Sequence, residues 1–232
     1  MIQKIKDQII KDKKIILAAF VSGLVFTTCV AFFTFLYAER IQGGISDSVL
    51  RFHVRADSDD YEDQVLKMEV KNAVLESLYG GLPNAATREE AIAYVAKNID
   101  KIIETAQELI NYNGFDHLVD AYLTTDFFPT MTYGGVTLPP GFYETLRIDI
   151  GAAAGENWWC VMFPPLCYVD LSIAKLPEAE MEAFRYILTS SEYEIITAAG
   201  TDIEVRFRIV EWWQNRQSSS DRTPRPTVAQ HR

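Results

Sequence analysis

Cysteine, histidine and glycine are residue types that often form nucleophiles, metal sites and phosphate-binding loops. Cys160 and Cys167 stand with six residues between them in CVMFPPLC, and neither a histidine nor a second cysteine pair lies beside them. Zinc sites use three or four nitrogen or sulfur ligands at short, recognisable spacings. Gly134-Gly135 and residues 151–155 lack the third glycine, or the Lys-Ser/Thr pair, of a nucleotide-binding loop. We therefore expect neither a metal site nor a cofactor.

The two thiols could instead pair with each other or serve as a nucleophile. Closing an eight-residue loop with a disulfide would contribute roughly 2 to 3 kcal/mol, and two buried free cysteines are the alternative. A thiol hydrolase would need one of them beside His53 or His117 and an acidic residue. No local hydrolase signature surrounds either cysteine. The disulfide and the free thiols both stay open, and we expect no catalytic residue.

Trp158 and Trp159 are adjacent, and neighbouring residues of a strand point to opposite faces of a sheet. One ring can fill the core, while the other is either covered by a helix or loop or left as an anchor for a protein partner. The turn that follows holds Pro164 and Pro165, which donate no backbone hydrogen bonds. The candidate partner interface consists of these two tryptophans, these two prolines and Tyr133.

The charge of the chain is unevenly distributed. Its 232 residues carry a formal net charge of −10, yet both ends are basic. Residues 1–14 contribute +3 and residues 217–232 contribute +2, which leaves −15 for residues 39–216. A surface this acidic repels phosphate backbones, so we expect no nucleic-acid partner.

Residues 15–38 form an uncharged run of 24 residues. As a helix this run would extend about 36 Å, enough to cross a hydrocarbon core of about 30 Å. Five lysines precede it, so the positive-inside rule places residues 1–14 in the cytoplasm and the remainder of the chain across the membrane. The run is long for a signal peptide, and residues 36–38 make a poor cleavage site, so we expect a retained anchor, with cleavage as the alternative.

Beyond a linker at residues 39–48, the sequence predicts one extracytoplasmic α+β domain over residues 49–216 and a disordered tail at 217–232. Apolar alternation predicts strands at 50–56, 118–125, 142–150, 158–163 and 205–209. Helical periodicity predicts helices at 57–79, 87–113 and 177–188. Asp57, Asp59 and Asp60 are expected to cap the first helix rather than bind calcium, and Thr87 with Glu90 makes a capping box. Helices and strands do not alternate strictly, which favours a two-layer domain with a mostly antiparallel sheet.

One long segment, from Phe128 to Asp170, resembles the family of stage II sporulation protein R. It contains a tyrosine-glycine turn, a proline-glycine-x-tyrosine strand entry, and the run NWWCVMFPPLC, which is long enough to be specific. Upstream, residues 55–59 (RADSD) and 63–67 (DQVLK) are similar to the opening strand and helix of that family. The resemblance covers about residues 49–210. Asp57 stands where the family has asparagine, and the arginine-proline tail lies outside the resemblance.

The resemblance implies a signalling protein of endospore-forming bacteria. Members are made in the forespore, exported into the space between the two engulfment membranes, and needed for a mother-cell membrane protease to process the precursor of sigma-E. On this interpretation the chain is not an enzyme but the ligand that switches the protease on. A secreted cell-wall-binding module, which would use an exposed tryptophan, and an exported thiol hydrolase are the alternatives.

Overall fold

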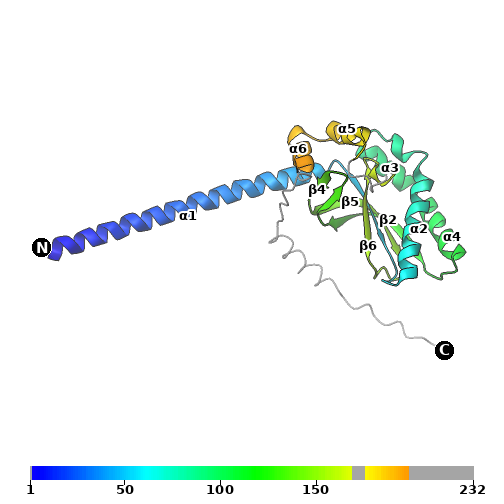
Figure 1. Cartoon of the computed structure of the whole chain (residues 1–232), viewed down its shortest axis with the longest axis horizontal. Helices are drawn as coiled ribbons and strands as arrows, with labels where there is room; N and C mark the ends of the chain where they lie inside the picture. The colour runs from blue at the N-terminus through cyan, green and yellow to red at the C-terminus, as the bar shows by residue number, and fades with distance from the viewer. Residues whose placement is uncertain (1, 169–175, 199–232) are drawn as a thin grey trace, which may run out of the picture.

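Helix α1 (Ile2–Ser46) projects from the rest of the chain as one long element (Figure 1). The computed structural model describes residues 2–168 and 176–198, so the strand expected at 205–209 and the tail at 217–232 lie outside the described residues. The segment Asp12–Ser46 of α1 is long and apolar enough to cross a membrane, and the protein buries none of its most apolar stretch. Helix α1 thus has the length and composition of a membrane span or a signal sequence.

The last turns of α1 belong to the folded domain. Residues 39–46, where we expected a linker, remain helical, and the side chain of Ile45 is fully buried in the core. A side chain on Gly44 would collide with Glu192, and one on Gly141 would collide with Gln42. The helix therefore meets the domain in close contact, without an irregular spacer after residue 38.

A four-stranded sheet forms the centre of the domain, in the order β2-β5-β1-β6. Strand β1 (Leu50–Arg55) pairs parallel with β5 (Gly141–Ile150) and antiparallel with β6 (Asn157–Phe163). Strand β2 (Val119–Phe128) lies antiparallel to β5 at the other edge. The mostly antiparallel α+β arrangement and these four strands confirm the prediction from the sequence.

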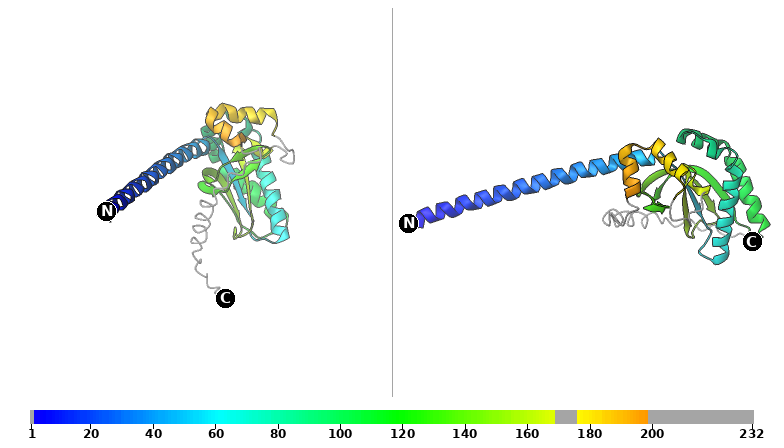
Figure 2. Two further views of the ribbon diagram at one scale, coloured as in Figure 1. Left: turned by 60° about the vertical axis from the view of Figure 1, so that its left-hand side comes forward. Right: turned by 45° about the horizontal axis from the view of Figure 1, so that its top comes forward.

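Helices α2 (Tyr61–Leu78) and α4 (Ile99–Tyr112) cover one face of the sheet. Figures 1 and 2 show them on the side of the sheet away from the free end of α1. The single helix expected at 87–113 is two helices, because the chain breaks at Asn98 between α3 (Arg88–Lys97) and α4. The Thr87 cap is present at the start of α3, where the Glu90 N–H donates to Oγ1 of Thr87, while the Glu90 carboxylate accepts the N–H of Ala86, one residue before Thr87.

The opposite face of the sheet carries a short hairpin that the sequence did not predict. Strands β3 (Met131–Tyr133) and β4 (Val136–Leu138) form a hairpin whose two turn glycines have positive φ, which glycine adopts without strain. The predicted third helix is α5 (Glu178–Ile187), and α6 (Ser190–Ala198) follows it. Two short 3-10 turns, at Leu82–Asn84 and Leu166–Tyr168, complete the described elements.

Candidate functional site

The two tryptophans of β6 lie on opposite faces of the sheet, as the alternation of a strand requires. Trp158 packs edge-on against Phe52, with ring centroids 5.7 Å apart, and Nζ of Lys71 lies 4.8 Å from its ring centre. Trp159 lies on the other face, where its ring centroid is 5.9 Å from that of His53. Both tryptophans keep part of their surface exposed. Each could contact a partner, but not on one common face.

The other three residues of the candidate interface differ in exposure. Tyr133 is 3% exposed and Pro164 is buried, whereas Pro165 is partly exposed. The hydroxyl of Tyr133 accepts a hydrogen bond of 2.9 Å from Nη2 of Arg51. Tyr133 and Pro164 therefore pack within the domain and have almost no surface to offer. The part of the candidate interface that a partner could reach is reduced to the two tryptophans and Pro165.

Arg51 lies on the same face of β1 as His53, at the centre of a cluster of aromatic rings. It is fully buried, and its guanidinium carbon lies 4.2 Å from the ring centre of Phe128 and 5.0 Å from that of Tyr143. Its Nε donates to the backbone oxygen of Cys160 at 3.1 Å. Burial raises the pKa of Tyr143 to about 12, although the charge of Arg51 acts in the opposite direction. Strand β1 is thus buried on both faces, because aromatic rings enclose this cation.

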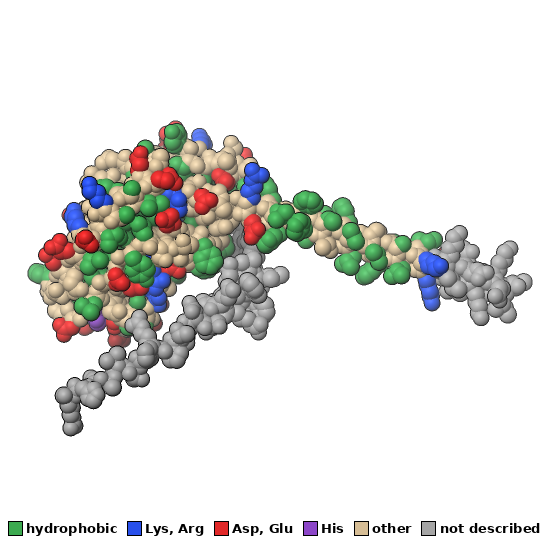
Figure 3. Space-filling model, turned by 180° about the vertical axis from the view of Figure 1, so that it is seen from behind, with side chains coloured by type: hydrophobic (Ala, Val, Ile, Leu, Met, Phe, Trp, Pro, Cys, Tyr) green, Lys and Arg blue, Asp and Glu red, His purple; other side chains and the backbone are tan. Residues whose placement is uncertain are grey.

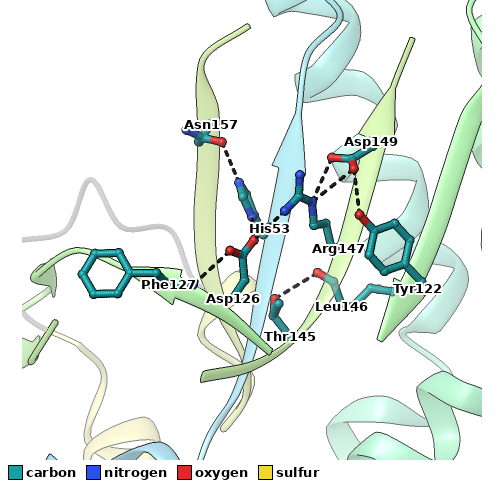
Figure 4. A network of polar contacts seen from close by, with 9 residues as sticks. All are labelled: His53, Tyr122, Asp126, Phe127, Thr145, Leu146, Arg147, Asp149 and Asn157. Atoms are coloured by element: carbon teal, nitrogen blue, oxygen red, sulfur yellow. Dashed lines mark hydrogen bonds and ion pairs between the residues drawn. The ribbon is translucent and has the colours of Figure 1, made fainter. Parts of the chain in front are cut away.

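A polar network lies in the middle of the sheet, on the face opposite α2 and α4 (Figure 4). Nδ1 of His53 lies 2.7 Å from Oδ2 of Asp126, and Nε2 lies 2.7 Å from Oδ1 of Asn157. Nη1 of Arg147 donates to the same Asp126 oxygen at 3.0 Å. The network continues from Arg147 through Asp149 to the hydroxyl of Tyr122.

The geometry of this network ties strands together rather than activating a nucleophile. Both ring nitrogens of His53 already have protein partners, so neither is free to accept a proton from a substrate. Its partners come from β2 and β6, on either side of β1 and β5. From the sequence, His53 is only a possible base, and Asp126 is not predicted as its partner, because Asp126 comes from a strand 73 residues away.

Asp126 makes the stability of this face depend on pH. Burial alone would raise the pKa of its carboxyl, but the hydrogen bond and charge of His53 and the charge of Arg147 outweigh burial, so the pKa is lowered. A carboxyl whose pKa is lower in the folded state stabilises the fold above its unfolded value of about 3.9 and loses that contribution as the pH falls through the folded value.

We expect Asp126→Asn to cost about 2 kcal/mol of unfolding free energy near pH 7, because it replaces a charged acceptor of two donors. The difference from the wild type should shrink as urea denaturation is repeated from pH 6 down to about pH 2. The exposed Asp116→Asn is the matched control and should change the unfolding free energy little. A difference for Asp126→Asn that stays constant across this range would contradict the assignment.

The cysteine pair is present as free thiols. Sγ of Cys167 donates to the backbone oxygen of Val161 at 2.9 Å and lies beside Cys160, and burial raises its pKa well above the ordinary value. Cys160 pairs in register with Phe52 and therefore lies on the opposite face from His53. This placement does not bring a cysteine and His53 together. The disulfide between Cys160 and Cys167 stays a prediction.

Asp57, Asp63 and His117 form a second polar cluster, at the end of the sheet where β1 leads into α2. Nε2 of His117 lies 3.1 Å from Oδ1 of Asp63, and Nδ1 lies 3.9 Å from Oδ1 of Asp57. These residue types and separations could hold a metal ion. However, Asp57 also accepts the N–H of Ala152, and Asp63 accepts the hydroxyl of Ser58, so protein donors already occupy both carboxylates.

The aspartates after β1 do not cap α2, contrary to our expectation. Asp60 is the N-cap residue but its side chain makes no capping bond. Asp57 and Asp59 instead accept backbone N–H groups from the loop between β5 and β6, at Ala152 and Glu156. They therefore hold the loop after β1 against the loop between β5 and β6, nearly a hundred residues further along the chain.

Comparisons with known proteins agree with one another. The family model described as stage II sporulation protein R matches residues 46–173, which include all four strands of the central sheet together with Trp158, Trp159, Cys160 and Cys167. A curated relative, stage II sporulation protein R of Bacillus subtilis (strain 168), is 30% identical over 181 residues, which cover 72% of this chain and 81% of the relative. No solved structure matches the chain. The chain therefore belongs to the stage II sporulation protein R family.

Proposed function

We propose that this protein is an exported sporulation signal that activates a mother-cell membrane protease by protein–protein contact, and so promotes processing of the sigma-E precursor. Membership of a sporulation family is the observation that carries the proposal. The uncharged run at residues 15–38 of α1, which five lysines precede within the same helix, supports placing the domain on the far side of the forespore membrane. The domain would then act in the space between the two membranes.

The polar groups of the described residues support a role without turnover. His53 has protein partners on both nitrogens, and the buried Cys160 lies on the other face of the sheet. A ligand without chemistry of its own can still switch an enzyme by binding the active arrangement more tightly than the inactive one. Moving a protease from 1% to 99% active would need a differential affinity of about 5.5 kcal/mol.

The exposed parts of Trp158, Trp159 and Pro165 are one candidate source of that affinity. Tryptophan is among the residues that contribute most to binding energy at protein interfaces. Trp159 keeps part of its ring exposed, while the ring of His53 lies beside it. We propose that this side chain contributes a contact to the protease.

The proposal is tested by following processing of the sigma-E precursor in sporulating cells that lack the gene and are complemented with defined variants. The wild-type chain should restore processing, and Cys160→Ala should restore it as well, because the account assigns no chemistry to that thiol. Trp159→Ala should lower processing while the protein is still exported and folded. Normal processing in the deletion strain would overturn the proposed function. Loss of processing with a folded Cys160→Ala protein would favour the thiol hydrolase instead.

A further inference from the structure

Helix α2 has apolar side chains on two sides. Leu66, Val70 and Val74 are buried against the sheet and α4. On the opposite side, Tyr61 is 82% exposed, Val65 39% and Met68 37%. Steps of four and three residues place these three side chains in one row along the helix. We call Tyr61, Val65 and Met68 the outer stripe of α2.

The outer stripe is unusual for a surface helix, which normally confines its apolar residues to the buried side. Helix α4 follows that rule more closely, since Ile102, Ala106 and Ile110 are its buried residues, and its exposed residues are charged or polar apart from Tyr112 in the last turn. Tyrosine and methionine are also enriched at protein interfaces relative to the remaining surface. The stripe therefore has the composition of a contact surface.

A row of carboxylates runs beside the outer stripe. Glu62, Glu69 and Glu76 are all exposed and are spaced seven residues apart, which places them on one line of the helix. The lysines of α2 do not neutralise this row, because Lys67 donates to Gln64 and to the backbone oxygen of Glu156, and Lys71 lies over the ring of Trp158. The outer side of α2 is thus apolar along its middle and acidic along one edge.

The position of α2 decides which kind of partner it can meet. The layer formed by α2 and α4 lies on the side of the sheet away from the free end of α1 (Figures 1 and 2). In the view of Figure 3, the hydrophobic side chains of α1 form a column that ends at the domain. If α1 spans the forespore membrane, the helical layer faces away from that membrane. Its carboxylates also disfavour anionic lipid.

We propose that the outer stripe of α2 is a docking surface for a helical segment of a protein partner, one with an apolar row flanked by lysine or arginine. A straight ridge of side chains on one helix packs well against another helix, and basic side chains would meet Glu62, Glu69 and Glu76. Lys71 joins this surface to Trp158 at the edge of the sheet. The inference rests on the proposed function, which makes the partner an extracytoplasmic segment of the protease.

The test uses the full chain in sporulating cells and follows processing of the sigma-E precursor. The triple variant Tyr61→Ala, Val65→Ser, Met68→Ser should lower the processing rate at least about tenfold, because three contact side chains are lost together. The matched control is Leu118→Ser, Phe142→Ser, Tyr186→Ala. It removes three apolar side chains that are 79%, 63% and 87% exposed on other elements, and it should process the precursor at the wild-type rate.

A charge reversal tests the acidic edge separately. Glu62→Lys with Glu76→Lys should also lower processing, whereas Glu178→Lys with Glu182→Lys on α5 should not. Glu69 is left unchanged because it accepts a hydrogen bond from Asn113. Urea denaturation of each variant in detergent checks that the domain remains folded, which is expected because all the substituted residues are exposed.

The possible outcomes distinguish a failure of the docking proposal from a failure of the proposed function. Normal processing in the deletion strain would overturn both. If the deletion strain fails to process but the outer-stripe triple variant processes normally, the function stands and the docking surface is wrong. The docking surface is also wrong if the matched control loses processing to the same extent while folded.

Discussion

Replacing Gly155 by alanine should lower the free energy of unfolding by about 3 kcal/mol. A Cβ at this position would lie 2.1 Å from the backbone oxygen of Ser58 and 2.5 Å from its carbonyl carbon. Neither is the end of a flexible side chain, so one of the two loops must move. That movement would also break the hydrogen bonds that the N–H groups of Ala154 and Gly155 donate to Asp57 and Ala56. Urea denaturation of the full chain in detergent measures the loss.

Gly80→Ala is the matched control for this prediction. A Cβ on Gly80 would meet no atom within 4 Å, and its backbone does not have a positive φ. We therefore expect a change within about 0.5 kcal/mol, which is typical of surface substitutions. Equal effects of Gly155→Ala and Gly80→Ala would show that the close approach of the two loops does not limit stability.

Arg51→Ala should cost about 3 to 5 kcal/mol of unfolding free energy. The substitution empties a fully buried site, leaves the backbone oxygen of Cys160 without its donor, and removes a cation from the faces of Phe128 and Tyr143. Arg51→Lys should recover only part of the loss. A lysine cannot reproduce the planar group that donates to Cys160 and Tyr133 while stacking on aromatic rings.

The comparison for Arg51 is Arg185, whose guanidinium carbon lies 5.1 Å from the ring centre of Tyr193 at an exposed position. Arg185→Ala should cost no more than about 1 kcal/mol, because an exposed cation–π contact is worth about that much. If Arg51→Ala lowers the free energy of unfolding as little as Arg185→Ala does, the aromatic rings around Arg51 do not stabilise the fold as we describe.

Local patterns were sufficient to predict the main elements. Alternation located β1, β5 and β6 within about a residue, because each has at least one continuous apolar face. The α3–α4 break was missed, since the apolar stripe continues across Asn98 and only the backbone turn there reveals it. The β3–β4 hairpin was missed because its strands are three residues long and lie between prolines.

Long-range contacts are the part of the candidate site that the sequence does not predict. Arg51 and His53 alternate with apolar residues, which predicts exposure, yet rings and carboxylates from distant strands bury both of them. Tyr133 is buried for the same reason, because it meets Arg51 across 82 residues of sequence. Asp57 and Asp59 precede a helix and have the positions of capping residues, but their carboxylates accept hydrogen bonds from backbone N–H groups of the loop between β5 and β6. No local spacing encodes these pairings.

The junction between α1 and the domain bears on how the signal would be presented. Because Ile45 is in the core and Gly44 packs against Glu192, the end of α1 is held by the fold rather than by a loose linker. An anchored domain would then keep one orientation relative to its membrane, with α2 and α4 on the far side. This orientation is what the proposed docking surface requires.

The central claim is that the folded domain lies across the membrane from residues 1–14. Protoplasts that express full-length Leu118→Cys or Lys13→Cys can be treated with a membrane-impermeant maleimide, with the wild-type chain as background. We predict that Leu118→Cys, which places a thiol at a 79% exposed position of the domain, is labelled in intact protoplasts. Lys13→Cys should be labelled only after the membrane is permeabilised. The reverse pattern, with Lys13→Cys labelled and Leu118→Cys protected until permeabilisation, would contradict the account.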